Sequence, residues 1–209
     1  MNRKLILGVV CLLLGATAVQ AQQVNEAQVR QRISQVASKM KTMQCDFVQT
    51  KYVKMLNDKM VSKGKMYYRQ PNKLRWEYTS PYAYTFLLND SKVQMKSSQR
   101  SSVVDVKQNK LFGEIARVMM NSVVGKCLSD EKDFRVSMAE SRGEWIATLL
   151  PVRKEMKQMF QKIILHFDKS QSMVSEVDLL EKNGDKTVIS LRGVKVNQAI
   201  DDDCWVLEK

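Results

Sequence analysis

The sequence predicts a mainly β protein of the α+β class, with one strongly curved antiparallel sheet, open or closed into a barrel, and two amphipathic helices. About ten short segments alternate apolar and polar residues at period two, as strands with one buried face do. Turn residues separate these segments, most clearly Asn183-Gly184. Since no linker or change of composition interrupts the series, we expect one continuous meander.

Residues 1–21 have the pattern of a secretory signal peptide. Basic residues precede a short apolar run at 5–14, and small residues follow up to Ala21. The run is too short to span a bilayer. Cys11 lies inside it without a small residue before it, so we do not expect lipid attachment there. Cleavage after Ala21 would leave 22–209 as a single exported, soluble domain.

A first amphipathic helix is expected at residues 24–43. Apolar side chains recur there at helical spacing, and polar residues occupy the opposite face. Asn25 suits the N-cap position, and Gln28 lies three residues later. The helix is therefore expected to pack its apolar face on the sheet.

The stretch 64–81, GKMYYRQPNKLRWEYTSP, predicts a β-hairpin with a large apolar inner face. Its turn falls at Gln70, Pro71 and Asn72, because proline cannot lie inside a central strand. The inner face carries Met66, Tyr68, Leu74, Trp76 and Tyr78. Such a face needs a cover, which is either an ordinary core or a bound molecule.

The other strands are expected at 45–55, 60–69, 82–88, 101–107, 134–138, 145–149, 160–168, 173–181 and 186–196, with a short one beginning at Val93. A second amphipathic helix is expected at 111–124, ended by Gly125. Residues 151–159 break the alternation, as a loop or a short helical turn would. The tail at 200–207 is expected to add an edge strand.

The net charge of the whole chain is +12. Such a balance suits nucleic acid, anionic lipid or an acidic partner. Export argues against nucleic acid. The lysines are spread between apolar residues along the predicted strands, so the simplest interpretation is a set of solvated strand faces.

The sequence contains no recognisable catalytic or metal-binding motif. His166 is the only histidine, and a metal site needs about three or four convergent ligands. Nucleotide-binding, hydrolase and zinc-protease motifs do not occur in the chain. We therefore expect a binding or carrier protein without metal or cofactor, not an enzyme.

Cysteine and methionine content leaves alternatives open. Cys45, Cys127 and Cys204 remain after the signal peptide, and an odd number excludes a complete intramolecular set of disulfides. One bridge, such as 127 to 204, and buried free thiols are both compatible with the sequence. The 13 methionines suit either ordinary core filling or a pliable surface for apolar ligands.

The order of these features resembles the LolA family of periplasmic outer-membrane lipoprotein carriers. The resemblance covers residues 24–207: an amphipathic helix, a CDFVQTKYV strand, a mid-chain helix and a final NGDKTVISLRGVKVN meander. It is most specific in the motif G-x-x-x-Y-R-x-P-N-x-L-R-W-E-Y-x-x-P at 64–81.

The resemblance implies a half-open curved antiparallel β-barrel covered by amphipathic helices, with acyl chains held between the two. It further implies a periplasmic monomer of the Gram-negative envelope, which takes acylated lipoproteins from an inner-membrane exporter to an outer-membrane acceptor. The helix at 111–124 is the expected lid, together with the first helix. The cavity residues implied are Met66, Tyr68, Leu74, Trp76, Tyr78, Phe86, Leu88, Phe112, Ile115 and Met119.

One position departs from the family pattern. The family's lid-holding arginine directly precedes the motif proline, where this chain has Gln70. Arg69, one residue earlier, is the replacement candidate, although adjacent strand residues face opposite sides unless a bulge intervenes. Two other functions share the expected fold: carriage of another lipid or hydrophobic product, and an envelope sensor or interaction module with a protein partner.

Overall fold

A computed structural model describes residues 25–107, 117–118, 120–122, 124–129 and 132–207 of the protein. The expected signal peptide at 1–21 and the first part of the second helix lie outside these residues. Within them, eleven strands form one sheet in the order β6-β5-β4-β3-β2-β1-β11-β10-β9-β8-β7. Every neighbouring pair is antiparallel. The strands β6 and β7 form its two unpaired edges, so the barrel is half-open as predicted.

The strands and helices follow the sequence closely. The strands are β1 (Thr42–Val53), β2 (Asp58–Arg69), β3 (Lys73–Ser80), β4 (Tyr84–Asn89), β5 (Lys92–Ser97), β6 (Ser101–Asp105), β7 (Phe134–Ser141), β8 (Glu144–Pro151), β9 (Phe160–Asp168), β10 (Met173–Glu181) and β11 (Lys186–Val196). The helical elements are α1 (Glu26–Lys39), η1 (Lys54–Leu56), η2 (Lys126–Ser129), α3 (Lys154–Met159) and η3 (Asp202–Trp205). The described residues between 117 and 124 are also helical.

Two predicted elements are corrected by the structure. The first helix ends at Lys39, because Met40 is already extended and Met43 is buried from β1 instead. Apolar residues three apart suit a helix and the approach to a strand equally well, so spacing alone misplaced this end. The tail forms η3, a short 3-10 helix, and not an edge strand. The three cysteines 45, 127 and 204 form no disulfide.

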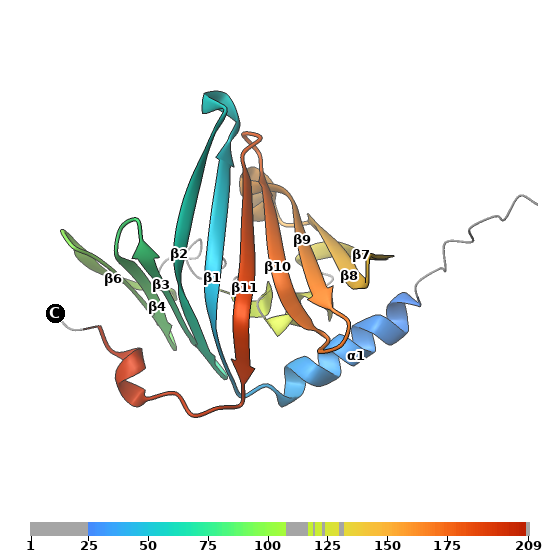
Figure 1. Ribbon diagram of the computed structural model, residues 1–209, viewed down its shortest axis with the longest axis horizontal. Coiled ribbons are helices and arrows are strands. Elements are labelled where there is room, and N and C mark those ends of the chain that lie inside the picture. Colours follow the sequence, from blue (N-terminus) through green and yellow to red (C-terminus); the bar gives the residue numbers. More distant parts are fainter. Residues whose placement is uncertain (1–24, 108–116, 119, 123, 130–131, 208–209) are drawn as a thin grey trace, which may run out of the picture.

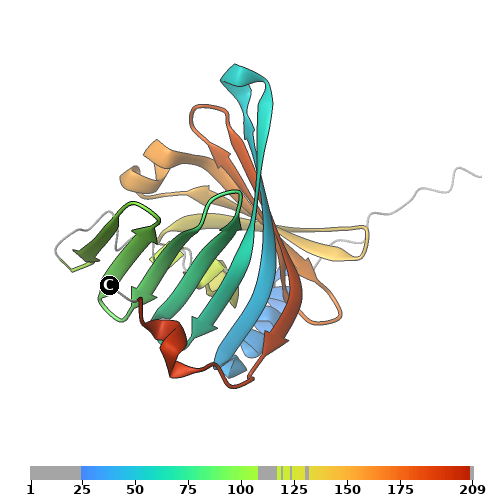
Figure 2. The ribbon, with the colours of Figure 1, turned by 60° about the vertical axis from the view of Figure 1, so that its left-hand side comes forward.

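The curvature of the sheet gives it a concave and a convex side (Figure 1). Figure 2 shows the sheet curling around α1 and the helical residues near 120. Cross-strand partners on the concave side continue from strand to strand. One row is Cys45, Met66, Trp76, Phe86 and Met95, and the next is Met43, Tyr68, Leu74, Leu88 and Val93. These rows form most of the part of the core that lies on β1–β5.

Helix α1 covers the lower part of the concave side and also protects an edge of the sheet. Its apolar face, Val29, Ile33 and Ala37, is buried. Glu26 accepts a hydrogen bond from the backbone N–H of Met138 in β7 at 3.0 Å, and Arg30 donates to the carbonyl of Val136 at 2.6 Å. These bonds occupy backbone groups that an edge strand would otherwise expose. Helix α1 is thus fastened to the sheet.

The C-terminal segment packs on the convex side of β2 and β3. The guanidinium of Arg69 bonds to the Asp202 carboxylate and to the Ile200 carbonyl, and it lies 5.2 Å from the centroid of the Trp205 ring. Arg75 adds a hydrogen bond to the Cys204 carbonyl at 3.1 Å. These contacts hold the C-terminal segment against the outside of the hairpin formed by β2 and β3, and we call this arrangement the tail clamp.

Candidate functional site

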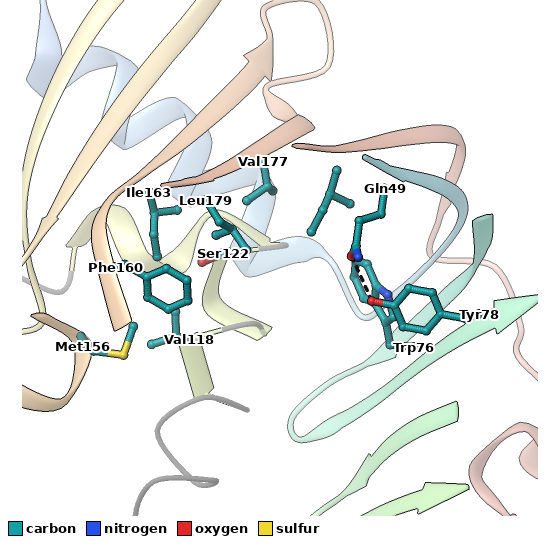
Figure 3. Close-up of a pocket in the computed structure, with 11 residues that line it drawn as sticks. Gln49, Trp76, Tyr78, Val118, Ser122, Met156, Phe160, Ile163, Val177 and Leu179 are labelled. Atoms are coloured by element: carbon teal, nitrogen blue, oxygen red, sulfur yellow. Dashed lines mark hydrogen bonds between the residues drawn. The ribbon is translucent and has the colours of Figure 1, made fainter. Parts of the chain in front are cut away.

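An apolar pocket of about 260 Å³ lies on the concave side, between the sheet and the helical residues that cover it. Figure 3 shows the side chains that converge on it from opposite arms of the sheet. The lining residues are Gln49, Trp76, Tyr78, Val118, Ser122, Met156, Phe160, Ile163, Val177, Leu179 and Ile189. The pocket thus joins segments far apart in the sequence.

One wall is an aromatic cluster on β1 and β3. The ring of Phe47 lies 4.5 Å from that of Trp76 and 5.2 Å, edge-on, from that of Tyr78, measured between centroids. Phe47 reaches them by crossing Gly64 of β2. A Cβ at that glycine would lie 2.6 Å from the Phe47 ring and 2.0 Å from the Glu77 carbonyl oxygen. Only glycine therefore fits beneath the cluster.

The opposite wall is formed by β9, β10 and β11. Val177 pairs with Ile189 of β11, and Leu179 pairs with Ile163 of β9. Because side chains alternate along a strand, these four residues share the concave face. Phe160, at the start of β9, closes this side beside the buried Met156 of α3.

The described helical residues between 117 and 124 form the roof. Val118 and Ser122 point into the pocket, and Gly125 ends the helix with φ near +75°. Arg117 forms an ion pair with Asp133, whose carboxylate also lies 2.8 Å from Arg153 Nε. The side chain of Asp133 is only 2% exposed. This buried carboxylate therefore ties the roof to the segment before β7 and to the residue before α3.

A few polar groups interrupt the apolar lining. The Tyr78 hydroxyl donates a hydrogen bond to Gln49 Oε1 at 2.9 Å, and burial raises the pKa of Tyr78. The hydroxyl of Ser122 is buried without a hydrogen-bond partner, whereas the indole N–H of Trp76 lies close enough to the Tyr78 hydroxyl to lower its pKa against the larger effect of burial. Unpaired buried donors cost about 1–3 kcal/mol each, so the pocket favours a ligand that carries hydrogen-bond acceptors.

Comparison with known proteins identifies the family. The family model described as "Outer membrane lipoprotein carrier protein LolA" matches residues 38–207, most of the chain. The chain belongs to the LolA family. It is also 22% identical, over 178 residues, to an outer-membrane lipoprotein carrier protein of Pseudomonas putida, covering 85% of this chain and 83% of that protein.

Solved structures show the same fold. An uncharacterized conserved protein from Thermus thermophilus has a TM-score of 0.53 at 9% identity, with 88% of this chain and 94% of that chain covered. MucB, in the Pseudomonas aeruginosa MucA/MucB complex, has a TM-score of 0.51 at 12% identity, with 88% of this chain and 62% of the other covered. At these identities the likeness concerns the fold of LolA proteins alone.

The structure places the cavity residues implied by the LolA resemblance in two groups. Trp76 and Tyr78 line the pocket. The others described are packed into the concave rows below it, where all but the half-buried Phe86 are at most 3% exposed: Met66, Tyr68, Leu74, Phe86 and Leu88. Three predicted residues lie outside the described residues: Phe112, Ile115 and Met119.

Arg69 does not occupy a latch position. Its side chain lies on the convex side, bonded to the C-terminal segment, because no bulge displaces it and neighbouring strand residues alternate in direction. The arginine that holds the roof in this LolA protein is Arg117, through Asp133. Gln70, at the family's arginine position, instead contributes a hydrogen bond to Tyr68 that lowers its pKa, against the larger increase caused by burial.

Sequence reasoning missed the wall formed by β9–β11. The alternation at 160–168, 173–181 and 186–196 predicted these strands with their correct ends. It could not show that Ile163, Val177 and Ile189 meet the hairpin of 64–81, because the closure of the sheet through β1 and β11 is a long-range pairing. Nor did it find Gln49, whose role depends on the position of Tyr78.

The described part of the chain has no helix long and apolar enough to cross a membrane. Three residues with metal-binding side chains do lie together on the convex side: His166, Glu176 and Asp178. They are separate from the pocket, since they alternate with the residues that line it.

Proposed function

We propose that this LolA-family protein is a periplasmic carrier, which holds the acyl chains of lipoproteins in the concave pocket and transfers them from the inner to the outer membrane. The observation that carries the proposal is an apolar pocket under a helical roof, lined by described residues that offer no nucleophile paired with a base. Carriage needs no covalent step, which agrees with a family of carriers.

The energetics favour this kind of ligand. Each methylene that leaves water for an apolar site contributes about 0.8 kcal/mol, so an acyl chain needs a dry pocket to cross an aqueous compartment. The aromatic wall and the wall formed by β9–β11 provide apolar contact from two sides. The unpaired hydroxyl of Ser122 suits the ester or amide carbonyls that join acyl chains to a lipoprotein's terminus.

The pocket must enlarge to accept such a cargo. Its volume of about 260 Å³ lies below the ~300–1,000 Å³ common for sites of drug-sized ligands. The roof is the element able to move, because α1 is fastened to β7 whereas the roof is held by the Arg117–Asp133 ion pair. Loading therefore breaks that pair and swings residues 117–124 away from the sheet.

The test is native mass spectrometry of the protein purified from the periplasm of its own host. The expected complex has the mass of the mature chain plus one acylated lipoprotein. A bound mass equal to that of a free lipid or another small hydrophobic product would identify a different cargo for the same pocket. The proposed carrier function would be refuted if the purified protein held no ligand and also took up no fluorescent long-chain fatty acid.

A second candidate function is an envelope sensor that binds a protein regulator. It is favoured by the shared fold with MucB, which was crystallised with MucA. In the same experiment it predicts a stable complex with an unacylated protein. Acylated cargo in the pocket would reject it.

A further inference from the structure

We propose that the convex side carries a site for a divalent transition-metal ion, formed by His166 of β9 with Glu176 and Asp178 of β10. One ligand atom from each residue lies within 4.8 Å of those of the other two. His166 and Glu176 are direct cross-strand partners, and Asp178 follows two positions along the same face. Two adjacent strands thus present three donors to one point.

Each of the three residues has one polar atom held by a neighbour and a second atom left for an ion. His166 Nδ1 lies 3.2 Å from Glu144 Oε2, which leaves Nε2. Ser190 donates to Glu176 Oε2 at 2.7 Å. Outer partners of this kind fix the orientation of metal ligands, and a carboxylate behind a histidine is one of the recurring arrangements.

Asp178 supplies an independent sign of a missing partner. Its side chain is 9% exposed, and Oδ2 lies 2.8 Å from Lys186 Nζ. Its Oδ1 is buried without any hydrogen-bond partner. A buried carboxylate oxygen left in this way is costly, and a cation bound between Asp178 and His166 would satisfy it.

The local charge agrees with cation binding although the whole chain is basic. Glu144, Glu176 and Asp178 bring three carboxylates together, and the ammonium of Lys186 pairs with one of them. One imidazole with two carboxylates is a ligand set that Zn²⁺ accepts, with water completing the coordination from the solvent side. The bound ion would join β9 to β10 behind the wall of the pocket.

The experiment is isothermal titration of ZnCl₂ into the mature protein, purified without a histidine tag. We expect one ion per chain. Because His166 is the only histidine, the ¹⁵N signals of its ring report coordination directly, and Nε2 is expected to shift on binding. His166→Ala should abolish the binding, and the isosteric Asp178→Asn should weaken it by at least about tenfold, as should Glu144→Gln.

The matched control is Glu140→Gln, which removes an exposed carboxylate paired with Lys169 outside the cluster. It should bind Zn²⁺ as the unaltered protein does. Failure of the unaltered protein to bind Zn²⁺, or equal binding by all variants that remain folded by circular dichroism, would overturn the site. Neither outcome bears on acyl binding in the pocket.

Discussion

Tyr78 of β3 and Gln49 of β1 are joined by a hydrogen bond of 2.9 Å inside a mainly apolar pocket, across the intervening strand β2. Gly64 makes this possible, because its missing side chain lets Phe47 lie against both Trp76 and Tyr78. The hydrogen bond therefore marks a polar point in the pocket lining, and its geometry depends on the packing of Phe47 over Gly64.

Removing the Tyr78 hydroxyl alone should destabilise the protein more than replacing both partners of this hydrogen bond. Tyr78→Phe leaves the half-buried Gln49 Oε1 without its donor, which we expect to lower the free energy of unfolding by about 1 kcal/mol. The double variant Tyr78→Phe with Gln49→Leu should regain part of that loss. Urea unfolding of both single variants and the double variant measures the coupling, and strictly additive losses would show that the bond contributes nothing.

Gly64→Ala should be strongly destabilising. The new methyl group would overlap the Glu77 carbonyl oxygen and the Phe47 ring, so we expect a loss of about 3 kcal/mol in the free energy of unfolding. Near-ultraviolet circular dichroism should change with it, because the aromatic cluster is displaced. Gly193→Ala is the comparison: the added Cβ meets nothing within 4 Å, but φ is +60°, so it should cost only the left-handed backbone strain, about 1–2 kcal/mol. Equal effects at both positions would disprove the steric argument.

Asp133→Asn should loosen the roof. The neutral side chain cannot form the ion pairs with Arg117 and Arg153, so a fluorescent fatty acid should enter faster in stopped-flow mixing. Glu181→Gln removes the ion pair with Lys51, which joins strands away from the roof, and should leave the entry rate unchanged. If Asp133→Asn took up the fatty acid no faster than Glu181→Gln, the roof would not be held by Asp133.

The variant Arg69→Ala distinguishes two roles for Arg69: holding the C-terminal segment, as the structure shows, and holding the lid, as the family pattern suggested. We expect unchanged fatty-acid uptake, because Arg69 faces away from the pocket. The segment from Ile200 to Trp205 should become sensitive to proteolysis, since it loses its bonds to the guanidinium. A faster uptake with an intact tail would restore Arg69 as a latch.

Stability should fall in alkaline solution. Burial raises the pKa of Cys45 to about 12 and also raises those of Tyr68 and Tyr78 above their usual values. A folded pKa above the unfolded one means that stability is fully present below about pH 9 and is lost as the pH rises toward 12. Cys45 alone accounts for about 1.4 kcal/mol per pH unit in that window.

The measurement is the free energy of unfolding in urea at several pH values from neutrality to about pH 10.5. The variant Cys45→Ala should show a shallower decline than the unaltered protein, whatever its starting stability. Identical slopes in the two proteins would exclude a contribution from this thiol.

Local pattern was enough to predict most of the sheet. The period-two alternation in β9, β10 and β11 and the turn at Asn183-Gly184 reflect short-range rules, so the bounds of these strands were correct. The end of α1 and the form of the tail were wrong, because Met43 and Trp205 are placed by long-range packing on opposite sides of the sheet. Local secondary-structure propensity does not indicate which distant residues such side chains pack against.

The site was only half predictable for the same reason. Trp76 and Tyr78 of the aromatic wall lie within one hairpin, so they could be identified from adjacent residues, whereas Phe47 joins them from β1. The wall formed by β9–β11 meets the hairpin only when β1 pairs with β11. The roof ion pair joins a helical residue to the segment before β7, which periodicity along the chain does not reveal. His166 looked isolated along the chain, because its carboxylate neighbours come from the strand register and not from a sequence motif.

Titration with a triacylated lipopeptide shows directly whether the concave pocket binds acyl chains. Leu179→Trp fills the pocket from β10, whereas Leu180→Trp places the same ring on the opposite face of that strand. We predict saturable binding by the unaltered protein and by Leu180→Trp, and an affinity weakened at least about tenfold, or 1.4 kcal/mol, in Leu179→Trp. Absence of binding by the unaltered protein, or equal affinity in Leu179→Trp, would contradict the claim.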